Sequence, residues 1–175
     1  MTLPEEEKMQ RLHGRLEPEI QAFICQCQTL QLATVDKAGK PNVSYSPFVR
    51  NQEGYFVLIS LLARHAQNIQ NNSLVSLMMI EDEGSSKQIY ARKRLTFDAL
   101  GITVQRDSKL WQYVVVQMVD RFGDIVNDLV QLQDFNLIQF KPDHGLFVKG
   151  FGQAYGLSGN DLVDTTHIKG GDKAL

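Results

Sequence analysis

The sequence has little of what marks membrane-spanning, secreted or strongly charged proteins. No apolar run reaches the roughly 18 residues that span a bilayer, and the acidic start, Met1 to Lys8, lacks the apolar stretch of a secretory signal. The formal net charge of −2 gives no general attraction to nucleic acid or to an anionic membrane. We therefore expect a cytoplasmic protein that binds neither of them.

Cysteine is scarce as well. The chain has two, Cys25 and Cys27, and a C-x-C pair without further Cys or His partners is a weak indication of a metal site. We expect two reduced thiols, which fits a reducing compartment.

Several catalytic motifs are also missing. The sequence contains no G-x-x-x-x-G-K-[ST], no H-E-x-x-H and no G-x-S-x-G. Gly150-Phe-Gly152 lacks the third glycine of a dinucleotide-binding fingerprint and lies in a predicted strand. Candidate functional residues must therefore lie outside these common motifs.

What is present is an ordinary globular composition, with 43% hydrophobic and 22% charged residues, which predicts one soluble domain. Residues 5–27 have helical periodicity, although Gly14 and Pro18 predict two pieces or a kink. The apolar positions that carry this periodicity are Leu12, Leu16, Ile20, Phe23 and Cys27.

Alternation and turn signals predict a mainly β protein with helices, of the α+β class. Strands are predicted over 29–35, 41–49, 54–60, 73–80, 89–104 and, as more than one strand, 135–157; helices are predicted over 63–71 and 107–131. Six or seven strands with these turns favour an antiparallel barrel or a sandwich. We expect an N-terminal helical segment (1–28), a β domain (29–157) with a helical insertion near 107–131, and a C-terminal loop or tail (158–175).

Basic residues offer two candidate anion sites. Arg92 and Arg94 enter a predicted strand, where alternation sends both to one face; there they pair with a phosphate or propionate, or form a solvated edge. Arg64 opens the predicted helix 63–71, whose N-terminal N–H groups favour an anion. A plain helix-capping role is the alternative for Arg64.

Two further residues are candidates for ligand chemistry. His167 lies in the Gly-rich C-terminal segment, which is either a ligand arm or a frayed terminus, and neutral imidazole is the commonest metal ligand. Asp134 follows the second long helix. It is either an ordinary helix-exit residue or an acceptor that orients a ligand or water.

Most of the chain, about 10 to 172, resembles the pyridoxamine-5′-phosphate-oxidase-like split barrels, and its C-terminal part is similar to the HugZ/HutZ group of bacterial haem-utilisation proteins. The blocks that carry the first resemblance include Thr29-Leu-Gln-Leu-Ala-Thr-Val, Tyr55-Phe-Val-Leu-Ile-Ser and Ala91-Arg-Lys-Arg-Leu-Thr-Phe. The more specific blocks are Gly145-Leu-Phe-Val-Lys-Gly-Phe-Gly-Gln-Ala-Tyr and His167-Ile-Lys-Gly-Gly.

The resemblance implies an antiparallel split barrel that forms a homodimer and binds haem at the dimer interface. It implies oxidative opening of the porphyrin with O₂ and electrons, which releases iron. A C-terminal histidine, here His167, would bind the iron, and a carboxylate of the other protomer, here Asp134, would tune that histidine. Thr29 lies in the matching neighbourhood, and Arg92 or Arg94 would meet the propionates or the distal ligand.

The sequence departs from the group at one important position. The family tail carries a second histidine associated with iron, and Asp172 stands at that position here. A carboxylate is a hard ligand and a poor replacement for imidazole on haem iron. Either His167 ligates instead, or residues beyond 175 are missing from this sequence, or this member binds haem differently.

Two alternatives stay open. The wider split-barrel family binds FMN, and an FMN-dependent oxidoreductase would use Arg64, Ser60 and Arg94. Its phosphate clamp is weakened here by His65 and Asn42, which stand where basic residues are expected. The second alternative is a haem carrier or storage protein without turnover.

Overall fold

The computed structural model describes residues 5–158 and 164–168, which fall into two compact units. We call residues 29–77 and 99–141 the central unit, and residues 1–28, 78–98 and 142–175 the terminal unit. Three strands run from one unit into the other. No helix in the described part of the chain is long and apolar enough to cross a membrane.

The predicted antiparallel β architecture is confirmed. Over the described residues one sheet contains nine strands, in the order β2-β1-β5-β6-β7-β4-β3, with β8 on β7 and β9 on β8. The strands are β1 (Thr29–Val35), β2 (Pro41–Pro47), β3 (Val49–Asn51), β4 (Gly54–Ser60), β5 (Leu74–Ile80), β6 (Arg94–Thr103), β7 (Phe135–Gly150), β8 (Gln153–Ser158) and β9 (Asp164–Ile168).

Six or seven strands were expected, whereas the described residues form nine. This difference has two causes. The predicted strand 41–49 divides into β2 and β3 because Pro47, which has no N–H to donate, ends the β1–β2 ladder. Residues 164–168 form β9 and pair antiparallel with β8, although they were expected in a loop or tail.

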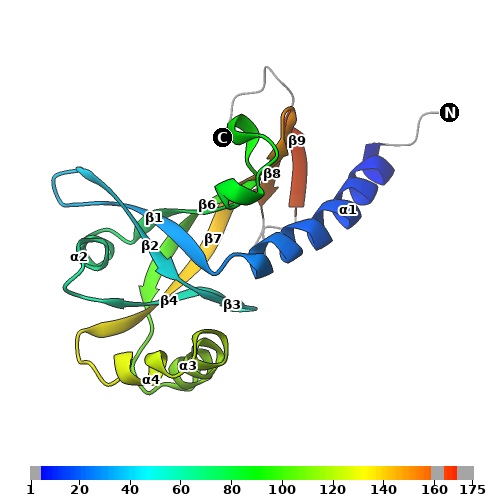
Figure 1. Cartoon of the computed structure of the whole chain (residues 1–175). Helices are drawn as coiled ribbons and strands as arrows, with labels where there is room; N and C mark the ends of the chain where they lie inside the picture. Colours follow the sequence, from blue (N-terminus) through cyan, green and yellow to red (C-terminus); the bar gives the residue numbers. More distant parts are fainter. Residues whose placement is uncertain (1–4, 159–163, 169–175) are drawn as a thin grey trace. The chain divides into compact units, whose positions relative to one another are not determined.

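The central unit is built around the β1–β2 hairpin and the helix α2 (Arg64–Asn71), which lies against it (Figure 1). The Asp36 carboxylate fixes the hairpin turn by accepting the N–H groups of Ala38 and Lys40, both at 2.9 Å. The buried Asn68 amide of α2 donates to Thr34 Oγ1 of β1 at 3.0 Å. The predicted helix 63–71 is thereby confirmed.

A second part of the central unit is helical. The predicted helix 107–131 divides into α3 (Lys109–Phe122) and α4 (Ile125–Leu129), which lie side by side (Figure 1). The break falls at Gly123, whose φ of 83° suits glycine. These helices bury apolar side chains against strand residues in one cluster, Val49, Phe56, Val104, Trp111, Val114, Met118, Val126 and Leu137.

The terminal unit contains α1 (Glu5–Gln26), which is one helix with Pro18 inside it. The prediction of two pieces was therefore wrong. Leu16 and Ile20, on either side of Pro18, are both buried, so packing on both halves offsets the hydrogen bond that proline removes. Phe23 of the same face lies 6.0 Å from the Phe147 ring of β7.

One further sequence expectation needs correction, and a second needs refinement. The strand expected from residue 89 begins at Arg94, because residues 89–91 form a 3₁₀ turn, η2 (Ile89–Ala91). Of the region 135–157, which was expected to hold more than one strand, residues 135–150 form one continuous strand, β7. That strand pairs with β4 up to Phe140 and with β8 from Gly145 onwards, so Pro142 lies between these two ladders, where no N–H is needed for either.

Candidate functional site

Two predicted site residues of the central unit form one pair. Ser60 ends β4 and Asp134 immediately precedes β7, and the Ser60 hydroxyl donates to Asp134 Oδ2 at 2.5 Å. The Asp134 carbonyl accepts the Leu61 N–H at 2.7 Å, and Ser60 Oγ accepts the Leu62 N–H at 3.1 Å. Both side chains are half-buried. Asp134 is thus an anchored carboxylate rather than a solvated helix-exit residue.

Arg106 holds the segment that carries Asp134, and sequence reasoning missed it. Its guanidinium donates to the carbonyls of Val130 (2.6 Å), Leu132 (3.1 Å) and Phe135 (2.5 Å). It also stacks 4.7 Å from the Trp111 ring. Three carbonyls on both sides of Asp134 are therefore bound by one planar cation. Nothing in the local sequence signals this, because the partners lie 24 to 29 residues away.

Arg64 is bound elsewhere in the central unit. Its side chain is 47% exposed and pairs with Asp36 at 3.4 Å. Hydrogen bonds from the backbone N–H of Lys40 and Ala38, together with the charge of Arg64, lower the pKa of Asp36. Arg64 and Ser60, assigned together to a phosphate clamp, thus have separate carboxylate partners.

His65 and Thr29 also lie in the central unit. Burial lowers the pKa of His65. Its Nε2 is buried and has no hydrogen-bond partner among the described residues, as is true of Ser44 Oγ. Thr29 begins β1 opposite Pro47 and is exposed. A buried polar atom without a hydrogen-bond partner is an exception in folded proteins, so the His65 imidazole is a candidate for a ligand contact.

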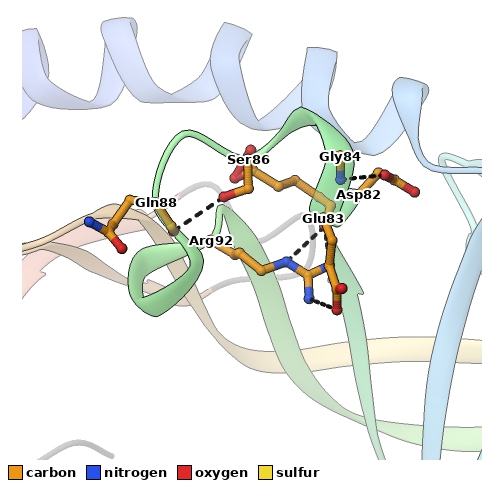
Figure 2. Close-up of polar contacts among 7 residues, drawn as sticks. Asp82, Glu83, Gly84, Ser86, Gln88 and Arg92 are labelled. Atoms are coloured by element: carbon orange, nitrogen blue, oxygen red, sulfur yellow. Dashed lines mark hydrogen bonds and ion pairs between the residues drawn. The ribbon is translucent and has the colours of Figure 1, made fainter.

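In the terminal unit, Arg92 is used to hold a loop, as Figure 2 shows. Its Nε, at 3.1 Å, and its Nη2 donate to the Glu81 carbonyl, and Nη1 pairs with Glu83 at 3.1 Å. The Arg92 side chain is only 19% exposed. Asp82 caps the loop's 3₁₀ turn, η1 (Glu83–Ser85), by accepting the Gly84 N–H at 2.8 Å.

The expected common strand face of Arg92 and Arg94 was therefore wrong. Arg92 precedes the strand, at the end of η2, whereas Arg94 is the first residue of β6. Arg94 Nη1 lies 3.4 Å from the Arg92 carbonyl. The structure places the two guanidinium groups in different local settings rather than side by side on a strand.

The C-terminal residues are only partly within the described chain. The backbone of His167 lies in β9, opposite Tyr155 of β8. Asp172 lies outside the described residues. Within the described residues, no cluster of three or more His, Cys, Asp or Glu side chains could hold a metal ion.

Comparisons with known proteins place this geometry in context. The family model described as pyridoxamine 5′-phosphate oxidase matches residues 16–149. The chain is 61% identical over 168 residues to the protein named heme oxygenase HutZ of Vibrio cholerae serotype O1, covering 96% of both chains.

Solved structures give the same result. A crystal structure of HutZ, described as the haem storage protein of Vibrio cholerae, has 58% identity and a TM-score of 0.75, covering 77% of this chain and 96% of that one. The crystal structure of ChuZ from Campylobacter jejuni has 28% identity and a TM-score of 0.82, covering 93% and 67%. The antiparallel split barrel predicted from the sequence is thus confirmed.

Proposed function

The chain belongs to the pyridoxamine 5′-phosphate oxidase family and, within it, to the group that contains HutZ, and on that premise we propose that it binds haem and degrades it oxidatively. The products would be an opened tetrapyrrole and iron, with O₂ and electrons consumed. The observation that carries this proposal is the 61% identity over 96% of both chains to a protein named heme oxygenase. We further propose a cytoplasmic homodimer.

The roles of individual residues follow from the resemblance and the local geometry. His167 is the proposed iron ligand, and Asp134 is the carboxylate proposed to orient the ligand histidine of the partner protomer. The short Ser60 hydrogen bond and the Arg106 clamp support this role, because they restrain a half-buried carboxylate. When bound, haem supplies the dioxygen chemistry. Thr29 and Arg94 stay predicted contributors.

Haem storage without turnover is the second candidate. It is favoured by the solved HutZ structure, which is described as a haem storage protein. Carrier and enzyme would share one binding site, so only turnover in the presence of a reductant separates them.

The FMN alternative rests on the family as a whole, and the local geometry does not favour it. Ser60 is bonded to Asp134, and Arg64 is paired with Asp36. A phosphate would have to displace a carboxylate from each of these two groups. Flavin absorbance of the purified protein is the test, and Arg64→Ala should then release the flavin.

The choice of iron ligand has its own experiment. His167→Ala should abolish the haem absorption band, whereas Asp172→Ala should leave it in place. Asp172→His adds back the imidazole expected in the family and should give a second ligand set with an altered spectrum. If Asp172→Ala alone removes the band, His167 is not the ligand.

A further inference from the structure

The terminal unit contains a cavity of about 500 Å³ between one helix and a strand pair. The residues that line it are Arg15, Leu16 and Glu19 of α1, Lys149 of β7, and Gln153 and Tyr155 of β8. Arg15 and Glu19 are four residues apart, and therefore neighbours on one helix face. Except for Leu16, every lining residue offers a polar or charged side chain.

The charge of this cavity is positive. Glu19 is paired with Lys149 at 2.5 Å and with Lys93 at 3.2 Å. Burial raises the pKa of Glu19, but the hydrogen bonds and charges of Lys149 and Lys93 outweigh it, so the pKa is lowered and Glu19 is ionised. Among the residues that line the cavity, Arg15 and Lys149 carry positive charge and Glu19 carries one negative charge, and Lys93 pairs with Glu19 from outside the lining. This excess of one positive charge favours an anionic ligand.

The wall of the cavity is next to the strand that carries the proposed iron ligand. Tyr155 lines the cavity and stands opposite His167 in the β8–β9 ladder. Neighbouring strands lie about 4.8 Å apart, so the two backbones are adjacent. A ligand bound close to the His167 backbone would therefore lie near this positively charged cavity, which belongs to the same unit.

We propose that this cavity binds a carboxylate of the ligand, with Arg15 as its cation beside the Lys149–Glu19 pair, and that for haem the carboxylate is a propionate. This deepens, and rests on, the proposed haem function. Arg15 is exposed, and its guanidinium can form a bidentate pair with a carboxylate. Gln153 adds a neutral amide donor. The sequence assigned propionates to Arg92 or Arg94, but Arg92 already holds Glu81 and Glu83.

The test compares variants of Arg15, each with a ligand that has propionate charges and with one that lacks them. Full-length wild type, Arg15→Ala and Arg15→Lys are titrated with hemin and with hemin dimethyl ester, which lacks the propionate charges. Lys37→Ala, in the exposed β1–β2 turn, is the matched loss of one cation. Arg15→Ala should weaken hemin binding about 3- to 10-fold, as expected for a partly exposed charged pair.

The ester decides whether that loss is a propionate contact. Arg15→Ala should bind the ester as wild type does, Arg15→Lys should recover part of the hemin affinity, and Lys37→Ala should change neither. Equal losses for hemin and ester, or no loss at all, would overturn the inference while the haem function stands. Absence of hemin binding by wild type would contradict the haem function itself.

A free small acid is the other source of a carboxylate, and succinate is its probe. Succinate could change the NMR chemical shift of the Tyr155 backbone amide in wild type but not in Arg15→Ala, while hemin binding does not depend on Arg15. These two results together would assign the cavity to a free acid and overturn the propionate assignment. Succinate binding weaker than hemin binding, and displaced by hemin but not by the ester, supports it.

Discussion

The Ser60 hydroxyl donates a 2.5 Å hydrogen bond to the carboxylate of Asp134, and this bond joins the end of β4 to the start of β7. The two residues are 74 positions apart in sequence. The register beside them is fixed, because Ser60 pairs with Phe135 in the β4–β7 ladder. The position of the Asp134 carboxylate, which is proposed to tune a haem ligand, is thus fixed by its hydrogen bond with Ser60.

Removing that contact should affect both stability and haem chemistry. Ser60→Ala leaves a half-buried carboxylate without its hydroxyl donor, and we expect about 1–2 kcal/mol of lost unfolding free energy. Urea unfolding measures it, with Ser73→Ala, an exposed serine, as the control. Haem turnover should fall with hemin affinity nearly unchanged. Wild-type turnover in Ser60→Ala would contradict the role of this pair.

Arg106→Lys should loosen the segment around Asp134. A lysine ammonium cannot reproduce the planar fork that reaches three carbonyls and stacks on Trp111. We expect a loss of about 2–3 kcal/mol in unfolding free energy. Hydrogen exchange at the Leu61 amide, which is bonded to the Asp134 carbonyl, should accelerate. An unchanged Leu61 exchange rate would show that Arg106 does not position Asp134.

His65 should make stability depend on pH just below neutrality. Because burial lowers its folded pKa below the unfolded value near 6.5, the unfolded state binds the proton more readily. Stability is therefore full above the unfolded pKa and falls as pH drops through it towards the folded pKa. Asp36 and Glu19, whose pKa values are lowered, lose their contributions only at more acidic pH.

The measurement compares His65→Gln with wild type by denaturant unfolding between pH 7.5 and 5.5. Wild type should lose stability over this interval, and His65→Gln should lose less. His144→Gln, which changes an exposed histidine, is the control and should behave like wild type. Identical pH profiles for His65→Gln and wild type would contradict the assignment to His65.

Arg92 is expected to act on the loop between β5 and β6. Arg92→Ala removes a largely buried side chain that binds the Glu81 carbonyl, and should cost about 1–3 kcal/mol in stability. Glu83→Gln should cost less than about 1 kcal/mol, because the Glu83 side chain is 77% exposed. If Arg92→Ala instead selectively weakens hemin but not hemin dimethyl ester, Arg92 is a propionate ligand.

Local patterns were sufficient for much of the fold. Alternation and a turn signal at Asp36 predicted β1, and the apolar run at 54–60 predicted β4. The periodicity of 5–27 predicted α1, but the helix-breaking effect of Pro18 was overestimated. The tertiary packing of Leu16 and Ile20, which offsets this effect, cannot be read from the sequence. Strand β9 was missed, because its polar residues show no apolar face and its pairing with β8 is a tertiary property.

The candidate site was less predictable. Asp134 was chosen from its position after a helix and from the resemblance, Ser60 was chosen from the resemblance alone, and their contact could not be anticipated. The Arg106 clamp depends on carbonyl groups, which any residue provides, so no sequence signal exists for it. Arg92 was placed on a strand because β propensity does not reveal that its guanidinium binds a preceding loop.

Oxidative degradation of haem is tested by titrating the purified full-length protein with hemin and then adding ascorbate in air. We expect a Soret band that saturates at one haem per protomer, is absent in His167→Ala, and disappears after ascorbate as free iron appears. A Soret band that survives ascorbate would contradict the degradation claim and favour storage. Flavin absorbance without any haem band would contradict the haem claim altogether.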